Sequence, residues 1–386
     1  MKHLAPSSYR AFVCAAGACP DSCCRAGWEI VIDPDTCELY RTLCGPAAER
    51  VRKGVVPPVG AAIGRPPEES ASQLCHSEPC PEQGRRGSEE SVPLSPAEPL
   101  LRQDKHRVCV LLDPDGLCHV QRNYGHEALC KVCRDYPRFR RDFGGLTEHG
   151  LSLSCPTAYA LATSAPPAWE EWEDDAPPIP NELDPESYLR LRKGRELALD
   201  LLTREELSLE TRLTLLRRLA AAMQSAPEKR IKHDYALRLR RWESLPVKYN
   251  SQFSALNSQL LRLARRFLTL EILSPAWKDA LERFLALTEA EARTAESPPG
   301  RRSPLPNALP EPATPEPYAR WLWYELYKYW MDALDDGMLL ARVDRALDML
   351  LLGLAMDQAL PGEGPFLRRI SREIEHCEEN LAALLK

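Results

Sequence analysis

Cysteine is the residue type whose number and spacing point most clearly to chemistry in this chain. Of its 14 cysteines, thirteen lie at or before Cys155, and only Cys377 lies beyond it. Thiolates are soft ligands that select zinc, copper(I) or iron–sulfur clusters. Because the first residues contain no apolar signal segment, we expect a reducing, cytoplasmic environment, where disulfides are rare. The concentration of thiols therefore predicts metal binding.

Two blocks of the sequence carry the metal-binding pattern. The first has the spacing C-x4-C-x3-C-C, and the second has C-x8-C-x11-C-x2-C followed by one more cysteine downstream. Short loops between thiols cost little closure entropy, so each block can wrap around one metal centre. The predicted metal ligands are Cys14, Cys19, Cys23, Cys24, Cys109, Cys118, Cys130, Cys133 and Cys155.

The spacing favours an iron–sulfur cluster over zinc. Structural zinc usually takes two short Cys/Cys or Cys/His pairs, whereas Cys130 and Cys133 are the only C-x2-C pair here. These thiols also exceed one tetrahedral site and suffice for a cluster, or for two centres. We expect a cluster of the [4Fe–4S] type, with zinc as the alternative. The C-x3-C-x2-C motif of radical enzymes is missing, since Ala26 stands at its third position.

The other cysteines and the nearby histidines are predicted to be structural. Free cysteines often act as small buried hydrophobes, and low-complexity segments make poor platforms for ligands. The cysteines outside the two ligand sets are Cys37, Cys44, Cys75, Cys80 and Cys377. His119 and His126 lie between the cysteines of the second block, where a surface histidine is expected more often than a ligand.

The chain divides at its Pro-rich segments. Residues 1–163 are predicted to form a cysteine-rich domain, interrupted at about residues 54–105 by a low-complexity, disordered insertion. Residues 182–386 are predicted to form an all-α domain with a Pro-rich break at about 297–317. The expected fold class is therefore mainly α, with a small, loop-rich cysteine domain packed on an all-α helical body.

Several helices of the second domain are visible in the sequence. An N-cap residue followed by proline marks a helix start, and it occurs at Asp184-Pro185, Ser274-Pro275 and Thr314-Pro315. The segment Thr203 to Glu206 predicts a capping box for another helix. Tyr318 to Trp330 is apolar around most of a helix circumference, which is typical of a buried helix and leaves a pocket lining as the alternative. An apolar helix is predicted over Val343 to Leu360.

Composition excludes two classes of partner. The net charge of −6 argues against a nucleic-acid-binding protein, which would carry a strong basic excess. Residues Arg134, Arg138, Arg140 and Arg141 form a basic group that is predicted to be a solvated face. No run of about 18 apolar residues occurs, so no membrane partner is expected.

The cysteine motifs resemble those of the flagellin lysine-N-methylases. The resemblance rests on Phe12 to Cys14, Cys19 to Asp33, Cys109 to Cys118, Leu129 to Arg138 and Glu148 to Pro156. It is dense over residues 10–50 and 105–160, and it weakens to general helical character beyond residue 160. The same cysteine skeleton also resembles a broader family of zinc- or iron-chelating domains that lack the helical body.

The resemblance implies a cytoplasmic enzyme that methylates lysine ε-amines of flagellin with S-adenosylmethionine as donor. Such transfer needs a neutral amine aligned with the donor and no radical. Side chains that could orient or deprotonate the amine are Tyr136, Glu148, Tyr324, Tyr327 and Tyr329. Each is more often structural, so the catalytic residue stays unassigned. No G-x-G-x-x-G motif follows a strand, so the donor pocket is not located either.

A non-catalytic iron–sulfur or zinc protein is the alternative function, as a metal chaperone or a redox sensor. It would carry the same cysteine motifs without a methyl donor. Saturable binding of S-adenosylmethionine is therefore expected only of the methyltransferase. The sequence does not indicate the oligomeric state.

Overall fold

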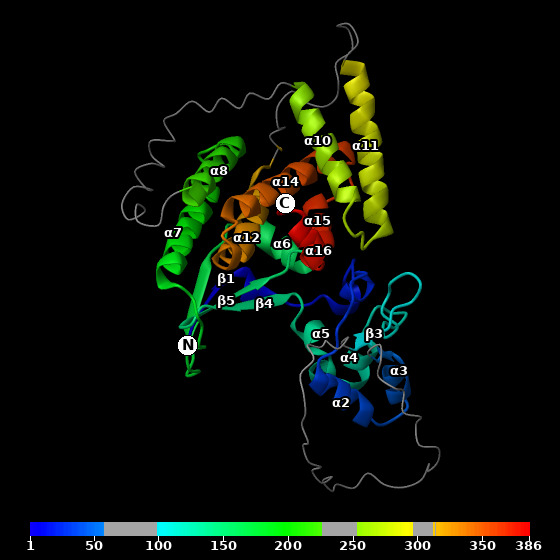
Figure 1. Cartoon of the computed structure of the whole chain (residues 1–386). Coiled ribbons are helices and arrows are strands. Elements are labelled where there is room, and N and C mark those ends of the chain that lie inside the picture. Colours follow the sequence, from blue (N-terminus) through cyan, green and yellow to red (C-terminus); the bar gives the residue numbers. More distant parts are fainter. Residues whose placement is uncertain (58–98, 226–252, 296–311, 313) are drawn as a thin grey trace, which may run out of the picture.

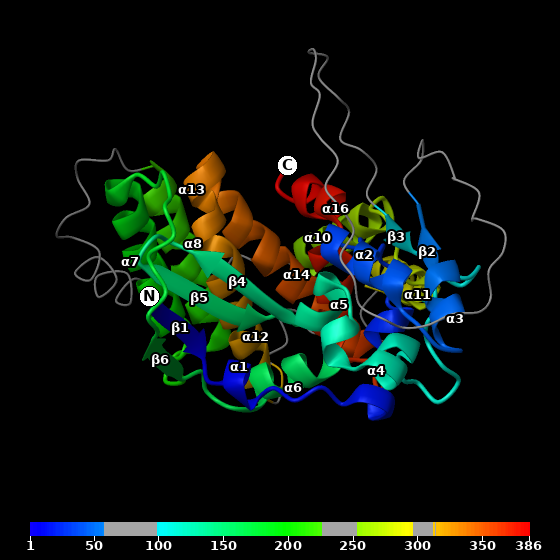
Figure 2. The same ribbon diagram turned by 90° about the horizontal axis from the view of Figure 1, so that it is seen from below.

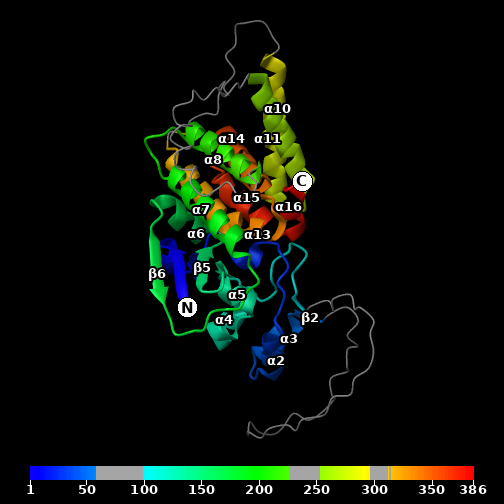
Figure 3. The ribbon, with the colours of Figure 1, turned by 60° about the vertical axis from the view of Figure 1, so that its left-hand side comes forward.

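The computed structural model describes residues 1–57, 99–225, 253–295, 312 and 314–386. It confirms a mainly α fold, with the cysteine-rich region at one end of a helical body (Figures 1 and 3). Most of the insertion predicted at 54–105, with Cys75 and Cys80, and most of the break predicted at 297–317 lie outside the described residues. None of the described helices is both long and apolar enough to cross a membrane.

The cysteine-rich region is built from short elements. These are η1 (Ala16–Ala18), η2 (Cys23–Arg25), α2 (Pro34–Thr42), α3 (Ala48–Lys53), β2 (Val55–Val56), β3 (Leu100–Leu101), α4 (His119–Tyr124), η3 (His126–Ala128) and α5 (Lys131–Asp135). Helix α2 begins where it does because the Asp33 carboxylate accepts a hydrogen bond from the Thr36 amide at 3.0 Å. Strands β2 and β3 pair antiparallel, so the two strands that flank the insertion lie side by side.

A four-stranded sheet, which the sequence analysis did not anticipate, packs against the helical body. Its strands are β1 (Lys2–Pro6), β4 (Arg138–Asp142), β5 (Leu146–Leu151) and β6 (Trp169–Glu173), in the order β4-β5-β1-β6. Strand β1 runs parallel to β5 and antiparallel to β6, and β4 and β5 form a hairpin. Figure 2 shows the four strands side by side, with α12 packed next to them.

The helical body supplies most of the described helices. They are α1 (Ser8–Ala11), α6 (Pro156–Ser164), α7 (Pro185–Leu202), α8 (Leu209–Ser225), α10 (Phe253–Leu268), α11 (Pro275–Ala295), α12 (Glu316–Tyr329), η5 (Trp330–Asp332), α13 (Ala333–Asp336), α14 (Leu339–Ala359), α15 (Phe366–Glu375) and α16 (Glu378–Ala383). One hydrophobic cluster joins these helices apart from α1, and it also takes in Leu153. The division at residues 163 and 182 stays a prediction.

The helix starts predicted from N-cap–proline pairs are confirmed for α7 and α11, whereas α12 begins one residue later than predicted, at Glu316, with Pro315 in the N-cap position. Asp184 caps α7 by accepting the Ser187 amide at 2.8 Å. The predicted capping box is wrong: Thr203 lies at the C-terminal end of α7, where its hydroxyl donates to the carbonyl of Asp200 at 2.8 Å. The residue that caps α8 is Ser208, whose hydroxyl accepts the Thr211 amide at 3.2 Å.

The aromatic helix is buried, as its composition predicted. Trp321 and Trp330 are at most 1% exposed. Each indole N–H has a partner: Trp321 donates to the Ser371 hydroxyl at 3.1 Å, and Trp330 donates to the Leu191 carbonyl at 2.9 Å. Burial of these large side chains is therefore achieved without leaving a polar group unpaired. The apolar helix predicted over Val343 to Leu360 is α14.

Buried polar contacts join the sheet to the helices and give structural roles to three of the candidate catalytic residues. The guanidinium group of Arg195 in α7 donates two hydrogen bonds to the carboxylate of Glu148 in β5, one of them 2.8 Å long. Both side chains are buried. The Tyr327 hydroxyl donates to the His149 carbonyl at 2.8 Å. The Tyr324 hydroxyl lies 3.1 Å from the hydroxyl of Ser8.

The loop after η2 meets the helical body at very close range. Gly27 has a φ of +86°, and a Cβ built there would lie 2.6 Å from the carbonyl oxygen of Leu273. Leu273 itself is buried in the hydrophobic cluster of the cysteine-rich region, together with Trp28 and Ile30. Glycine is required at this position for two reasons, the left-handed backbone and the approach of another chain segment.

Replacing Gly27 with alanine is expected to lower the free energy of unfolding by more than about 1 kcal/mol, because strain and the clash with Leu273 add together. The matched control is Gly125→Ala, since Gly125 has a similar φ of +85° and nothing within 4 Å of its Cβ position. Chemical denaturation of both variants measures the difference. Equal losses would show that the Leu273 contact contributes nothing.

Candidate metal centre and adjoining cavity

The predicted ligands gather from four separate segments of the chain. Cys14 and Cys19 flank η1, and Cys23 and Cys24 begin η2. The remaining ligands lie on the bridges and helix starts of the second block or at the start of α6, and they are Cys109, Cys118, Cys130, Cys133 and Cys155. Cys109, Cys130 and Cys155 are buried, Cys14 is exposed, and the other five are partly buried.

A backbone hydrogen bond joins the two cysteine blocks. The Cys109 amide donates to the Cys24 carbonyl at 2.9 Å. Two isolated bridges hold the second block, Gln103 with Cys109 and Leu112 with Cys118. Segments that are distant in the sequence therefore present their thiols to one region.

The thiols form two neighbouring groups joined by the Cys23–Cys24 pair. Cys23 has its pKa raised by a hydrogen bond with Cys24, by burial, and by the nearby Cys14 and Cys155 thiols. Cys19 and Cys14 add to the effect of burial in raising the pKa of Cys155. The first group is therefore Cys14, Cys19, Cys23 and Cys155.

The second group surrounds Cys109. Burial, together with the nearby Cys24, Cys118 and Cys130 thiols, raises the pKa of the Cys109 thiol to about 12. Cys133 hydrogen-bonds Cys130 and lies near Cys23 and Cys24, and its pKa is raised well above the usual value. The second group is thus Cys24, Cys109, Cys118, Cys130 and Cys133.

Hydrogen bonds to the sulfurs favour thiolate ligands, whereas burial acts against them by raising the pKa of most of these thiols. The hydrogen bond from Cys23 lowers the pKa of Cys24 to about 7, although burial opposes the change. Backbone amides of the following residues hydrogen-bond the sulfurs of Cys109, Cys118 and Cys155, and they partly offset the effect of burial on the pKa of each. Hydrogen bonds from backbone amides stabilise metal-bound thiolates and tune the properties of the clusters that they bind. The donor set therefore fits a thiolate-bound metal group.

The spacing of the thiols does not form a zinc-sized tetrahedron. Zinc–sulfur bonds of about 2.3 Å hold four sulfurs about 3.8 Å apart. Among the described residues, no three of the predicted ligands place their sulfurs within 4.8 Å of one another. A cluster spreads its thiolates over several irons and suits wider spacing.

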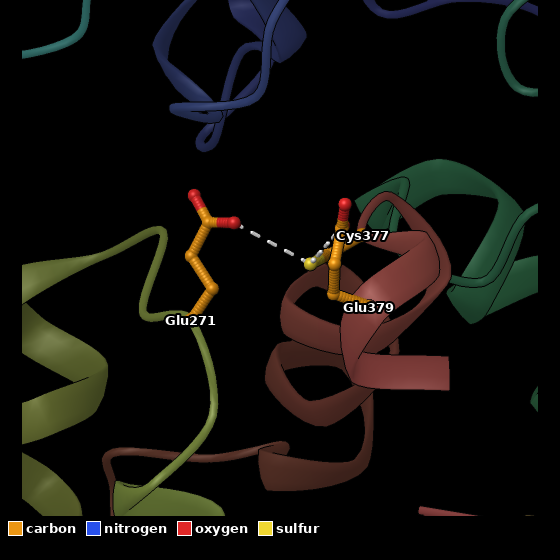
Figure 4. Close-up of side chains that lie close together, drawn as sticks. All are labelled: Glu271, Cys377 and Glu379. Carbon is orange, nitrogen blue, oxygen red and sulfur yellow. Dashed lines mark hydrogen bonds between the residues drawn. The ribbon is translucent and has the colours of Figure 1, made fainter. Parts of the chain in front are cut away.

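Within the described part of the chain, one group of three possible ligand atoms does lie within 4.8 Å of one another, and it comes from Glu271, Cys377 and Glu379 (Figure 4). The Cys377 sulfur lies 3.5 Å from one carboxylate oxygen of each glutamate, so its single S–H can donate to either of them. Burial and both carboxylates raise the pKa of Cys377, so the thiol keeps its proton. Glu271 also pairs with Arg107 at 3.4 Å. We interpret this group as a link between the Leu268–Leu273 loop and α16.

The remaining cysteines and the histidines have structural surroundings. Cys37 packs against the hydrophobic cluster of the cysteine-rich region, and Cys44 is exposed with its thiol donating to Thr42 at 3.5 Å. His119 lies 3.4 Å from the Asp113 carboxylate and 3.3 Å from the Ala47 carbonyl. His126 is exposed on η3.

The basic group is only partly a solvated face. Arg141 pairs with Asp332 at 2.6 Å and so ties β4 to η5. Arg138 donates to the carbonyl of Phe12 at 3.3 Å. Arg140 and Arg134 pair with neighbouring aspartates on the surface.

A cavity of about 400 Å³ adjoins the thiols where the cysteine-rich region meets the body, and we call it the junction cavity. Its lining residues are Cys23, Cys24, Trp28, Glu29, Ile30, Lys131, Val132, Cys133, Asp135, Tyr136, Pro137, Arg138, Phe139, Ser152, Lys328 and His376. Of the five candidate catalytic residues, Tyr136 is the one that lines this cavity. Sequence analysis missed Ser152, Lys328 and His376.

Aromatic rings form one wall of the junction cavity. The ring centroids of Trp28 and His376 are 4.0 Å apart, and those of Trp28 and Tyr136 are 5.3 Å apart. Tyr136 and His376 complete the set at 5.7 Å. We call these three residues the aromatic wall.

Behind the wall lies a buried network of hydroxyl and charged groups. The Ser154 hydroxyl is within 2.8 Å of His376 Nε2 and 3.0 Å of the Tyr136 hydroxyl. Ser152 donates to Glu375 Oε2 at 2.6 Å, and Lys328 forms an ion pair with the same oxygen. Burial would raise the pKa of Glu375, but Lys328 holds it below its usual value. Within this network, Lys328 therefore carries a positive charge and Glu375 a negative one.

Comparison with known proteins finds distant relatives. Over 163 residues, 42% of this chain, it is 24% identical to a lysine-N-methylase of Salmonella choleraesuis (strain SC-B67) and to the flagellar biosynthetic protein FliU of Salmonella muenchen. The identity to a lysine-N-methylase of Salmonella typhimurium (strain LT2) is 23%. The matched part spans only 33% of either lysine-N-methylase and 78% of the FliU protein. No family model and no solved structure matches the chain.

His376 is expected to make stability depend on pH. Burial lowers the pKa of His376 to about 4, from 6.5 in an unfolded chain. Between these values only the unfolded chain binds the proton, so the contribution of His376 to the unfolding free energy falls by up to about 3 kcal/mol as pH drops from 6.5 to 4. Burial also raises the pKa of Glu325 and of Glu373 to about 7, which acts in the opposite direction.

The measurement is therefore a difference. The unfolding free energy of the natural chain minus that of His376→Asn is expected to decrease across this pH window, because the two glutamates act equally in both proteins. Titration of the His376 ring by NMR is the independent check. A difference that does not change with pH, or an imidazole that titrates near pH 6.5, would contradict the prediction.

Proposed function

We infer that this protein is a lysine methyltransferase that uses S-adenosylmethionine to methylate flagellin in the cytoplasm, and that its cysteines hold an iron–sulfur cluster. The observation that carries this proposal is the similarity to proteins named lysine-N-methylase. The substrate follows from the family resemblance of the cysteine motifs and from the flagellar relative.

The chemistry requires little from the protein beyond positioning. The lone pair of a neutral lysine amine forms a bond to the methyl carbon while the carbon–sulfur bond breaks. Its electron pair stays on sulfur, which leaves as a neutral thioether, and the methylated amine releases one proton to solvent. Alignment of the two reactants and exclusion of water account for the acceleration of such a step.

The metal group is proposed to be a [4Fe–4S] cluster bound by four of the nine predicted thiols. Two features support it. The donor set consists of thiols whose sulfurs accept hydrogen bonds from backbone amides, and the distances between the sulfurs are longer than those in a zinc tetrahedron. A cluster would cross-link the cysteine loops that form one side of the junction cavity.

Protein purified without oxygen is expected to contain about four iron and four sulfide per chain. One variant in each thiol group, Cys155→Ser and Cys130→Ser, tests which group binds the cluster, and at least one of them is expected to lose more than half of the iron. Cys377→Ser is the matched control, because Cys377 is equally buried and lies outside both groups. Stoichiometric zinc without iron, or full iron in both test variants, would contradict the cluster.

The methyl transfer is tested with the full chain, loaded with its metal, and flagellin from the same organism. Isotope-labelled methyl groups from S-adenosylmethionine are expected to appear on flagellin lysines, as located by mass spectrometry. Flagellin with acetylated lysines is the control and is expected to gain none. If the metal-loaded protein transfers no label, the non-catalytic metal protein becomes the better explanation.

A further inference from the structure

The size and position of the junction cavity suit a small-molecule ligand. Its volume of about 400 Å³ lies within the range of pockets for cofactors and drug-sized ligands. Its lining comes from η2, α5, β4, α12 and the residue after α15, so it forms only when the cysteine-rich region and the body are in contact. A lysine side chain alone would leave much of this volume empty.

The aromatic wall favours a ligand that carries a positive charge. A cation over the face of a tryptophan or tyrosine is attracted by the ring quadrupole, and the attraction grows when water is excluded. Trp28 is 8% exposed and Tyr136 is partly buried. The wall therefore offers two electron-rich rings in a mostly dry setting.

The charged groups of the cavity match a ligand with charges of both signs. Glu29 and Asp135 lie exposed at its rim, as do Lys131 and Arg138. Glu375 is not a lining residue, but its Oε2 atom pairs with the lining residues Ser152 and Lys328, and its Oε1 atom is buried without a hydrogen-bond partner among the described residues. A ligand with a cationic centre, an ammonium group and a carboxylate would find a counterpart for each.

A second cavity of about 480 Å³ lies among α8, α10 and α14. Its lining within the described residues has as many charged side chains as leucines, five of each, and it includes no aromatic ring. It therefore lacks the feature that would recognise a sulfonium.

We propose that the junction cavity binds S-adenosylmethionine, with the sulfonium against Trp28 and Tyr136. This inference rests on the proposed function, which supplies the sulfonium donor. It adds the location of the donor pocket and the residues that recognise the charge. It also places the donor beside Cys23, Cys24 and Cys133, so that the segments carrying these predicted metal ligands form part of the pocket.

The test compares the binding of S-adenosylmethionine and S-adenosylhomocysteine to the metal-loaded full chain by calorimetry. The second ligand has a neutral thioether in place of the sulfonium. Trp28→Leu is expected to weaken S-adenosylmethionine binding about tenfold and to affect S-adenosylhomocysteine much less, since only the first ligand loses a cation–π contact.

A second variant blocks the cavity from its exposed side. Val132 lines the cavity and is 46% exposed, so Val132→Trp is expected to weaken both ligands by more than tenfold. The matched control is Leu39→Trp, because Leu39 is 38% exposed in the same region and lies outside the lining. It is expected to bind both ligands as the natural chain does. Metal content is measured for every variant.

Ultraviolet cross-linking of labelled S-adenosylmethionine to the natural chain gives a result that does not depend on any variant. Label on peptides containing Trp28 or Tyr136 is expected, and label on α8 or α14 instead would overturn the location. If the natural chain binds no S-adenosylmethionine, the proposed function fails. If it binds but the metal-loaded Trp28 and Val132 variants bind equally well, only the location fails.

Discussion

The contact between Asp21 and α15 is the constraint on which the rest of the site depends. Asp21 lies in the loop between Cys19 and Cys23, and its carboxylate pairs with Arg368 at 2.6 Å and Arg372 at 2.5 Å. Bonds between charged partners of this kind are short and strong. They hold α15 against the cysteine loop, and the end of α15 carries His376 to the face of Trp28. Two members of the aromatic wall, Trp28 and His376, thus come from segments that these ion pairs bring together.

Buried charge is concentrated around α12, on the side of the body that faces the sheet and the cavity. The buried pairs are Glu148–Arg195, Glu325–Arg345 and Lys328–Glu375. Removing two charges from water costs several kcal/mol, and the attraction between them often does no more than offset that cost. We interpret these pairs as contacts that fix the orientation of α12 rather than as sources of net stability. That orientation determines where Lys328 lies in the cavity.

Sequence patterns predicted the features that depend on near neighbours. The spacing of the cysteines is a local property, and so are the N-cap at Asp184 and the start of α11 after Ser274, each fixed by atoms within a few residues. The capping box at Thr203 failed because α7 extends to Leu202 and uses that threonine at its own end. A local motif cannot show which of two helices it belongs to.

Features that depend on distant residues left no such signal. Strand β1 pairs with β5 and β6, whose residues lie more than 140 positions away, for example Lys2 with Leu146 and with Glu173. Strand β6 reads Trp-Glu-Glu-Trp-Glu, which lacks the apolar–polar alternation that marks a strand in a sequence. His376 meets Ser154 across 222 positions, so its place in the cavity could not be read from spacing.

The two halves of the proposed site need each other for physical reasons. Helices as short as α4 and α5 are not stable alone, and the hydrophobic cluster that holds them is much smaller than that of the body. Small, loop-rich regions of this kind usually require a cross-link, and thiolate–metal bonds provide one whose binding energy is also folding energy. Because Trp28 belongs to this small cluster while His376 belongs to the body, metal binding would order the part of the aromatic wall that carries Trp28, and the ion pairs of Asp21 would set it against the part that carries His376. On the proposed function, the metal then acts as the support of the donor pocket, and the methyl transfer itself needs no electron from it.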